Sequence, residues 1–302
     1  MDFRGLDLNL LVVLDAVITE KNVTRASKRI HLSQSATSAA LSRLRDFFKD
    51  DLLVPIGRKM ELTNLALSLE KPVRNLLLQV ESTVISREEF APASSTRTFS
   101  VVASDYFVSV LLVEVLRDLH EQAPSVRFEI WPMMDAALEL LDNGEVDLLF
   151  TPEQFASPQQ PKEYLYEETY SCVAWSKNPR VGKTISAEDY IAGGHVEIRF
   201  GEVRHSITEE RLRAVGCNRR LEIVVPHSAA IPQFVVGTDR LATLPTRLAA
   251  LYASHFPLKY VPLPIKIAPT RLYMQWHRFQ EHHADSIWFR KAVQEIVSQR
   301  TQ

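Results

Sequence analysis

The sequence predicts a small, mainly helical N-terminal domain, a connecting helix, and a larger α/β domain with two lobes. Three observations support this organisation. Residues 6–54 contain neither glycine nor proline, and their apolar residues recur at helical spacing. From Thr98 onward, short apolar strands alternate with helical segments. The length of 302 residues is typical of about two domains.

Composition excludes several classes of protein. The chain is 46% hydrophobic and 24% charged, with a formal net charge of −2, which is typical of a globular rather than a disordered protein. Two cysteines, Cys172 and Cys217, cannot form a disulfide framework, so we expect a reducing, cytoplasmic compartment. The N-terminal segment lacks a signal-peptide pattern and no apolar run is long enough to span a bilayer, so we expect no membrane partner.

Positive charge is concentrated near the N-terminus. Residues 21–49 carry seven Lys or Arg and one acid, a net charge of +6, so the remainder sums to −8. A basic segment on an acidic body is expected where a small domain contacts phosphate. A solvated helical face without a partner explains the charge equally well. The choice therefore depends on how this segment folds.

The basic segment has the pattern of a helix-turn-helix. Helical spacing predicts a first helix around residues 8–17, a short second helix over residues 24–30, and a third helix that begins after the N-cap Ser33. The third helix has an apolar stripe of Thr37, Ala40, Leu41, Leu44 and Phe48, and an opposite face of Gln34, Ser35, Ser38, Ala39 and Ser42. Serines are weak helix formers, so stability does not explain this face. It suits a helix in the major groove, where Gln reads adenine and Ser contacts bases or phosphates.

A basic hairpin follows. The segment VPIGRKMELT predicts a turn at Gly57, with Arg58 and Lys59 at its tip. Arg58 at this position would contact a phosphate or enter the minor groove. The order of basic segment, hydroxyl-bearing face and basic hairpin predicts a winged helix-turn-helix.

Residues 62–88 form the next unit. Apolar or small residues recur there mostly at steps of three and four, at Leu62, Leu65, Leu69, Pro72, Leu76, Val80 and Thr83. This spacing is typical of a helix-helix seam, although a plain amphipathic helix on its own domain shows it too. Pro72 costs about 3 kcal/mol inside a helix, so we expect a kink or a new helix there. The stretch EFAPASSTRT is then expected to be a hinge.

The remaining residues alternate between strands and helices. Predicted strands are TFSVVAS, VRFEIWP, VDLLF, YSCVAW, HVEIRF, LEIVVP, LATLP, LKYVPLP and TRLYMQW, with helices over residues 107–121, 133–141 and 285–298 among the intervening segments. This spacing implies parallel βαβ units. The pattern indicates two α/β lobes, and the chain returns to the first lobe after about residue 268. Such lobes bind ligands between them and at the carboxyl ends of strands.

Polar and aromatic residues near the predicted strand ends are candidates for lining that cleft. They are Ser104, Asp105, Thr151, Thr169, His205, Pro245, Arg247, Tyr273 and Gln275. Arg247 would pair with a carboxylate or a phenolate, and Tyr273 would stack on an aromatic ring. An interlobe ion pair for Arg247 and a core position for Tyr273 are equally open.

No catalytic motif is present. The sequence lacks G-x-S-x-G, G-x-x-x-x-G-K-[ST] and G-x-G-x-x-G, and it has only 9 glycines. His282 and His283 are adjacent on a helix and do not converge on a metal as an i, i+4 pair does. Cys172 is expected to be buried and inert, and Cys217, in a polar turn, to be exposed. We therefore expect no enzyme, no metal and no cofactor.

The segment NVTRASKRIHLSQSATSAALSRLRDFFKDDLL resembles the winged helix-turn-helix of LysR-type transcriptional regulators, and the resemblance covers the whole chain. RGLDLNLLVVLDAVITEKNVTRAS, GEVDLLFTPE and WHRFQEHHADSIWFR are most similar to the subgroup of the nodulation regulator NodD and the aromatic-degradation regulators NahR and LinR. Ser35 stands where the family usually has Pro, and Leu53 and the pair Pro55 and Ile56 replace the usual Phe and Arg. The base preference of the target site therefore stays open.

The resemblance implies a homodimer or homotetramer that binds double-stranded promoter DNA of partial dyad symmetry. Expected DNA contacts are Thr24, Ser33, Gln34, Ser35, Ser38, Ser42, Arg43 and Arg58. It further implies a periplasmic-binding-protein-like effector domain whose candidate residues surround a small aromatic inducer, in an activator of catabolic or symbiosis-type genes. The expected divisions are 1–62 (winged helix-turn-helix), 63–90 (dimerising linker helix) and 91–302 (effector domain; lobe 1 about 97–168 plus 269–302, lobe 2 about 169–268). The alternatives are a small-molecule-binding α/β enzyme and a protein-interaction adaptor.

Overall fold

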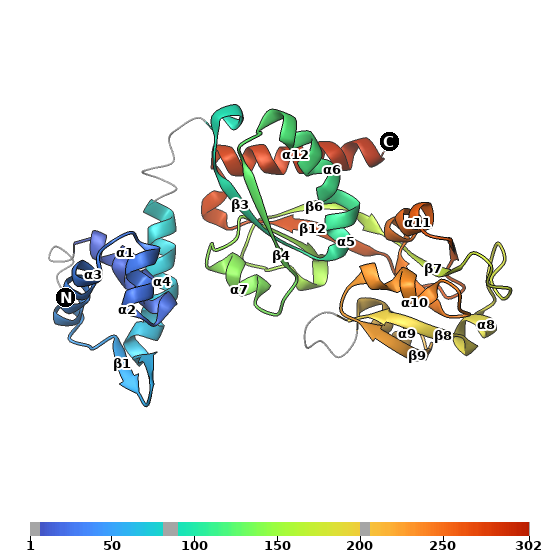
Figure 1. Ribbon diagram of the computed structural model, residues 1–302, viewed down its shortest axis with the longest axis horizontal. Helices are drawn as coiled ribbons and strands as arrows, with labels where there is room; N and C mark the ends of the chain where they lie inside the picture. The colour runs from blue at the N-terminus through green and yellow to red at the C-terminus, as the bar shows by residue number, and fades with distance from the viewer. Residues whose placement is uncertain (1–6, 81–89, 200–205, 302) are drawn as a thin grey trace. The chain divides into compact units, whose positions relative to one another are not determined.

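The computed structural model describes residues 7–80, 90–199 and 206–301. Contacts divide the chain into two compact units, Met1–Glu88 and Glu89–Gln302, which are described separately (Figure 1). Each unit has its own hydrophobic core.

Helices and one hairpin build the first unit. α1 (Asn9–Glu20), α2 (Val23–Arg29) and α3 (Gln34–Phe48) pack around a common core, and β1 (Leu53–Ile56) pairs antiparallel with β2 (Lys59–Leu62). The hairpin turns tightly at a glycine with a φ of +62°, a left-handed value that glycine adopts without strain. The predicted winged helix-turn-helix is therefore confirmed.

The connecting helix α4 (Asn64–Val80) also belongs to the first unit. It packs on α1 through the buried side chains of Ala66 and Val73. Pro72 lies inside the helix and its side chain is exposed, so the expected second helix does not start there. The predicted continuation to Thr83 lies outside the described residues.

The first lobe of the second unit contains a mixed sheet with the strand order β4-β3-β5-β12-β6. β3 (Thr98–Ala103) runs parallel to β4 (Arg127–Pro132) and β5 (Leu148–Pro152). β12 (Thr270–Gln275) enters antiparallel between β5 and β6 (Lys162–Glu168). The return of the chain to the first lobe agrees with the prediction, whereas β6 was not predicted.

Helices cover both faces of this sheet. α6 (Val113–Gln122) and α12 (Ala284–Thr301) lie on one face and α7 (Ala137–Asp142) on the other (Figure 1). The predicted helix 107–121 instead begins with α5 (Asp105–Phe107) and passes through a π-helical turn, Val108–Leu112, before α6. The helix predicted over 133–141 starts only at α7.

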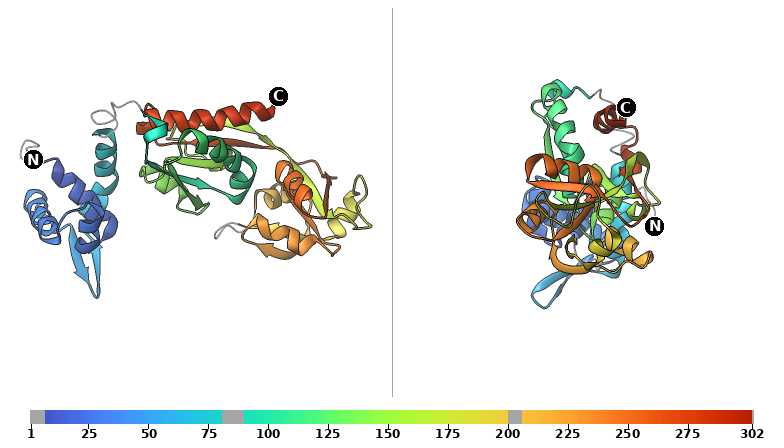
Figure 2. Two further views of the ribbon diagram at one scale, coloured as in Figure 1. Left: turned by 45° about the horizontal axis from the view of Figure 1, so that its top comes forward. Right: turned by 90° about the vertical axis from the view of Figure 1, so that its right-hand side faces the viewer.

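The second lobe has the strand order β11-β7-β10-β8-β9. β8 (Gly194–Ile198), β9 (Arg220–Val225) and β10 (Leu241–Pro245) are parallel, while β7 (Tyr170–Trp175) pairs antiparallel with β10 and β11 (Leu258–Pro262). The sheet is therefore mixed, because β7 crosses into the lobe against the direction of its neighbours. The two lobes lie side by side in the left view of Figure 2.

Short helices connect these strands. They are α8 (Ala187–Ala192), α9 (Ile207–Ala214), α10 (Ile231–Val235) and α11 (Thr246–His255), of which α11 was not predicted. Single 3₁₀ turns occur at Pro92–Ser94, Glu153–Phe155, Ser228–Ala230 and Arg278–Gln280. α11 also contacts the π-helical turn of the first lobe, so the lobes pack directly on each other.

Candidate functional site

The exposed face of α3 is set by its cap and by its buried side. Ser33 Oγ accepts a hydrogen bond from the N–H of Ala36 (3.1 Å), which starts the helix where the sequence predicted. Thr37, Leu41 and Leu44 are buried against the core. The opposite side is exposed and carries Gln34, Ser35, Ser38, Ser42 and Arg43, and Thr24 is exposed on α2.

The hairpin is held onto α3 by Arg45. Its Nε donates to the carbonyl of Asp51 (2.7 Å) and its Nη2 donates to the carbonyl of Leu53 (2.9 Å). This guanidinium therefore has a structural role in the first unit. Arg58 is exposed in the turn of the hairpin, as predicted for a wing.

Part of the positive charge in this unit is neutralised locally. Arg25 and Arg29 both pair with Glu20, at 3.1 and 3.5 Å, and Arg43 pairs with Asp7 at 3.5 Å. The arginines are exposed and Glu20 is partly exposed, and ion pairs near solvent are weak enough to rearrange when a phosphate approaches. The net charge of residues 21–49 thus overstates the field that a partner meets.

A cavity of about 450 Å³ lies between the two lobes of the second unit. Most of the side chains around it are apolar, among them Met133, Met134, Leu138 and Phe155 from the first lobe and Ile198 and Leu248 from the second. Its volume and apolar lining are typical of sites for small organic ligands.

The structure brings some of the predicted effector residues to this cavity. Ser104, Asp105, Thr151 and Pro245 line it, whereas Thr169, Arg247, Tyr273 and Gln275 do not. His205 lies outside the described residues. Thr169 is exposed, and its hydroxyl donates to Thr246 Oγ1 at 2.9 Å.

Arg247 forms an ion pair between the lobes. Its Nη1 lies 3.2 Å from Oε2 of Glu168, at the end of β6, and its guanidinium lies 4.3 Å from the centre of the Tyr166 ring. The Tyr106 hydroxyl donates to the same carboxylate. Burial, with the nearby Tyr166 and Glu168, raises the pKa of Tyr106 far above its ordinary value, which keeps this hydroxyl protonated as a donor.

Tyr273 and Gln275 lie on the face of β12 that points away from the cavity. The Tyr273 hydroxyl donates to Glu153 (3.3 Å), and the Gln275 amide accepts from the N–H of Ser157 (2.8 Å) and donates to its carbonyl (2.9 Å). Thr270 and Leu272, at alternate positions of the same strand, line the cavity instead. The alternating pattern of β12 correctly predicted that Tyr273 and Gln275 share one face of the strand. It did not show which face of the strand lines the cavity.

A second link between the lobes involves Asp105. Its carboxylate accepts hydrogen bonds from both the N–H and the hydroxyl of Ser228 in the second lobe. Ser228 Oγ in turn lies 2.9 Å from the Tyr252 hydroxyl on α11. This contact was not predicted, because residues so distant in the sequence give no local signal of their pairing.

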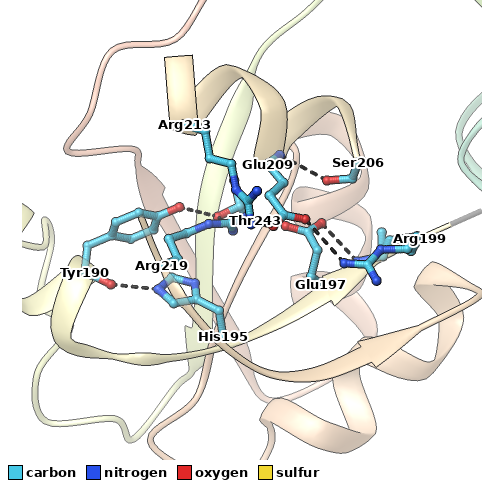
Figure 3. A network of polar contacts seen from close by, with 10 residues as sticks. Tyr190, His195, Glu197, Arg199, Ser206, Glu209, Arg213, Arg219 and Thr243 are labelled. Atoms are coloured by element: carbon cyan, nitrogen blue, oxygen red, sulfur yellow. Dashed lines mark hydrogen bonds and ion pairs between the residues drawn. The ribbon is translucent and has the colours of Figure 1, made fainter. Parts of the chain in front are cut away.

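Beneath the cavity, Glu197 and Arg219 form an ion pair whose side chains are each 2% exposed (Figure 3). Arg219 Nη1 also donates to Thr243 Oγ1 (3.1 Å), and that hydroxyl lies 2.6 Å from the Tyr190 hydroxyl. Glu197 and Thr243 line the cavity, so this network fixes two of the lining side chains that the second lobe contributes.

His195 lies in the same network (Figure 3). Its Nε2 is 2.7 Å from the carbonyl of Tyr190, which makes Nε2–H the donor, and its Nδ1 is buried without a hydrogen-bond partner. Burial lowers the pKa of His195 to about 4. The imidazole is therefore neutral at physiological pH.

The described residues show neither a metal site nor a cysteine that is readily ionised. Within residues 7–80, 90–199 and 206–301, no group of three or more His, Cys, Asp or Glu is placed to hold a metal ion. Burial raises the pKa of the Cys172 thiol to about 12, which opposes thiolate formation. Cys217 is also buried, packed near Leu212 of α9, so its predicted exposure was wrong.

The described helices include none that is long and apolar enough to cross a bilayer.

A winged helix-turn-helix followed by two α/β lobes around a cavity defines a DNA-binding transcriptional regulator with an effector-binding domain. Residues 8–67 match the family model "Bacterial regulatory helix-turn-helix protein, lysR family", and residues 92–298 match the model "LysR substrate binding domain". The chain therefore belongs to the LysR family of transcriptional regulators.

Relatives and solved structures agree with this assignment. The chain is 41% identical over 299 residues to a Nodulation protein D from Bradyrhizobium sp. (strain ANU 289), covering 99% of this chain and 88% of the relative. It is 40% identical to a Nodulation protein D 2 from Rhizobium leguminosarum bv. phaseoli, covering 99% of this chain and 94% of the relative.

Among solved structures, a probable transcriptional regulator from Pseudomonas aeruginosa aligns with a TM-score of 0.66 at 28% identity, covering 97% of this chain and 98% of the other. Full-length CbnR in complex with its target DNA shares the fold, with a TM-score of 0.55 at 17% identity, covering 97% and 100% of the two chains. The chain is thus a regulator, like these relatives, and not an enzyme.

Proposed function

We propose that this regulator is a homodimer or homotetramer that binds promoter DNA of partial dyad symmetry and responds to a small aromatic effector. The effector would occupy the cavity between the lobes, and the protein would activate nearby catabolic or symbiosis-type genes. In this proposal residues 1–62 bind DNA, residues 63–90 dimerise and residues 91–302 bind the effector. The observation that carries the proposal is a mostly apolar interlobe cavity in a chain whose other unit is a winged helix-turn-helix.

For DNA, we infer that α3 reads bases and the hairpin contacts the backbone. Gln34, Ser35, Ser38 and Ser42 are short or flexible polar side chains on one exposed face, which allows α3 to approach the floor of the major groove. Arg58, exposed at the turn, supplies a positive charge for phosphate or the minor groove. Thr24, Ser33 and Arg43 are retained as flanking contacts.

For the effector, we infer contacts from Ser104, Asp105, Thr151 and Pro245, with His205 kept as a prediction. Methionine and aromatic side chains along the wall suit the faces of an aromatic ring. Thr169, Arg247, Tyr273 and Gln275 are left out because their side chains do not line the cavity. The nodulation proteins among the relatives support a symbiosis-type regulon for this chain.

Effector binding is tested by a thermal-shift screen of aromatic acids, phenols and flavonoids on the full-length protein. A ligand at 100 times its Kd stabilises a protein by about 2.7 kcal/mol, which gives a clear shift in Tm. Ala156→Trp fills part of the cavity and should abolish the shift, whereas Ala136→Trp, at an exposed position that does not line the cavity, should preserve it. A shift that survives Ala156→Trp would place the effector elsewhere.

DNA binding is tested by mobility shifts at several salt concentrations with two variants. Arg58→Ala should weaken binding to all sequences and reduce the slope of log K against log salt by about 0.9, because one phosphate contact is lost. Gln34→Ala should also relax base preference at one position of the site. Wild-type affinity and selectivity in both variants would contradict the assignment of α3 and the hairpin.

A further inference from the structure

We propose that Asp50 is a positioning residue for DNA binding, which holds the hairpin of β1 and β2 in a fixed orientation relative to α3 and α4. In this orientation Arg58, at the turn, reaches the DNA backbone while α3 lies in the major groove. The inference rests on the proposed DNA contact of Arg58 and adds a residue that acts through this contact.

The hairpin depends on its base for its orientation. It projects from the helices of the first unit, and β1 and β2 form a sheet of two strands (Figure 1). Its tip, residues 55–59, is exposed. A two-stranded hairpin is at best marginally stable by itself in water. The contacts that fix its direction must therefore lie where its strands begin and end.

The backbone that enters the hairpin is in an unfavourable conformation. Between the end of α3 and the start of β1, Lys49 and Leu52 have φ values of +54° and +60°. Residues with a Cβ disfavour this left-handed region, and Leu52 lacks the short polar side chain that helps Asn or Asp to adopt it. Such a conformation persists where neighbouring contacts stabilise it.

The carboxylate of Asp50 supplies such contacts. Its Oδ1 accepts hydrogen bonds from the Leu52 N–H (2.7 Å) and from the Thr63 hydroxyl (2.6 Å), which follows β2. The Thr63 N–H donates to the Leu52 carbonyl (3.1 Å), and its Oγ1 accepts from the N–H of Ala66 in the first turn of α4 (3.2 Å). Hydrogen bonds to an ionised acceptor are stronger than neutral ones. One carboxylate oxygen thus joins the segment that leaves α3, both ends of the hairpin and the start of α4.

Arg45 and Asp50 hold the hairpin from two sides. Arg45, on α3, donates to the carbonyls of Asp51 and Leu53, whereas Asp50 connects the base of the hairpin to α4. Each strand has four residues, so the turn lies about 13 Å from the base. A rotation of about 10° at the base would move the turn by about 2 Å, which is enough to break a hydrogen bond to a phosphate. Loss of the Asp50 carboxylate should therefore weaken the contact of Arg58 without a change at α3.

The first test measures the salt dependence of DNA binding by the full-length protein. The probe is the duplex that the wild-type protein selects from a randomised library, and binding is measured by mobility shift at several salt concentrations. Asp50→Ala should reduce the slope of log K against log salt by about 0.9, the same change as for Arg58→Ala. The two substitutions combined should reduce the slope no further, because they remove the same contact. A wild-type slope in Asp50→Ala, or reductions that add in the double variant, overturns the inference.

Two controls separate position from charge. Asp50→Asn removes the negative charge and keeps an oxygen that accepts the hydrogen bonds of Leu52 and Thr63. Asp51→Ala removes the same charge from the adjacent, exposed side chain. Both variants should retain the wild-type slope. A slope reduced as much in Asp50→Asn as in Asp50→Ala would assign the effect to charge and overturn the inference.

Footprinting on the same duplex distinguishes the hairpin from α3. Hydroxyl radicals attack the deoxyriboses, whereas dimethyl sulfate methylates guanine N7 in the major groove. We expect Asp50→Ala to lose protection of the sugars that Arg58→Ala also exposes, and to keep the N7 protection that α3 gives. Loss of both protections together would mean that Asp50 supports the fold of the whole unit, and it overturns the role in positioning.

A second pair of variants leaves Asp50 in place. Thr63→Val removes the hydroxyl that donates to Asp50 and keeps the shape of the side chain, whereas Thr63→Ser keeps the hydroxyl. Thr63→Val should weaken the protection of the same sugars, and Thr63→Ser should preserve it. Wild-type protection in Thr63→Val would contradict the link between the hairpin and α4.

The outcomes separate this inference from the proposed function. If Arg58→Ala leaves both the slope and the protection of the sugars unchanged, the proposed contact of the hairpin is wrong and the inference fails with it. If Arg58→Ala lowers the slope and Asp50→Ala does not, the contact of the hairpin stands and only the positioning role of Asp50 is refuted.

Discussion

At the scale of single residues, the second unit buries a charged side chain together with a partner of opposite charge. Glu197 and Arg219 are both almost fully removed from water, and Arg219 Nη1 also donates a hydrogen bond to Thr243 Oγ1. A buried ion pair adds little net stability, because desolvation of both ions offsets their attraction. Removal of one partner is strongly destabilising, because the charge of the other partner is then buried without a counter-charge.

Replacement of the arginine shows this asymmetry. Arg219→Met should lower the free energy of unfolding by about 3–5 kcal/mol, because Glu197 loses its counter-charge. Urea unfolding monitored by circular dichroism measures the change. Arg220→Met is the control: its side chain is 66% exposed and pairs with Glu222, so we expect a change within about 0.5 kcal/mol. Equal effects of the two variants would argue against a buried pair.

His195 makes stability depend on pH. Its pKa is about 4 in the folded protein and 6.5 in the unfolded chain, so only the unfolded chain gains a proton between these values. Stability is therefore unaffected by His195 above pH 6.5 and falls as the pH drops toward 4, by about 3 kcal/mol in total. His195→Gln retains a donor for the Tyr190 carbonyl and cannot titrate. Its unfolding free energy, measured by urea titration from pH 7 to pH 4, should fall less steeply than that of the wild type.

At the scale of elements, the sequence was most informative where a local rule determines the structure. Ser33 starts α3 because its hydroxyl caps the helix, and Gly57 sets the hairpin turn because the turn needs a positive φ. β6 was missed because KEYLYEE contains four charged residues and lacks the apolar pattern of a buried strand. Its place in the sheet comes from pairing with β12, more than 100 residues away, which no local pattern reveals.

The effector site was predicted less well for the same physical reason. Ser104 and Asp105 follow β3 directly, and the end of a strand in an α/β lobe is a common ligand position, so they could be inferred. Tyr273 could not, because alternation along β12 leaves the choice of face open. The partner of Arg247 was equally hidden, since Glu168 lies on another lobe and 79 residues away.

The linker helix α4 offers a prediction at this scale. Ala66 and Val73 pack on α1, while Leu76, on an adjoining face, is 42% exposed. If this face pairs with a second copy, Leu76→Glu should shift the protein toward monomer in sedimentation experiments. Lys71→Glu, an exposed change on another side of the same helix, should leave the oligomeric state unchanged. Dimers of normal stability in Leu76→Glu would move the interface away from this face.

At the scale of the whole molecule, the net charge of −2 combines two unlike parts. The basic segment lies in the unit with the winged helix-turn-helix, and the acidic remainder includes the lobes with carboxylates at their cavity. This distribution favours DNA binding by one unit and discourages it in the other. Signalling between the units then requires that the lobes respond to a ligand in the cavity. The side chains that join the two lobes are best placed to transmit this response.

A substitution of Asp105 tests whether the polar contacts between the lobes hold them together. Asp105→Ala removes the acceptor of the Ser228 N–H and hydroxyl, one of the two polar links described between the lobes. We expect the Ser228 amide to exchange its hydrogen at least tenfold faster in the variant, measured by hydrogen-deuterium exchange on the effector-free protein, because the closed arrangement is populated less. Asp118→Ala, on the exposed side of α6, should leave this exchange at the wild-type rate. Unchanged exchange in Asp105→Ala would mean that the Glu168–Arg247 pair and the apolar contacts of α11 suffice to fix the lobes, and that a ligand displacing Asp105 cannot signal through their separation.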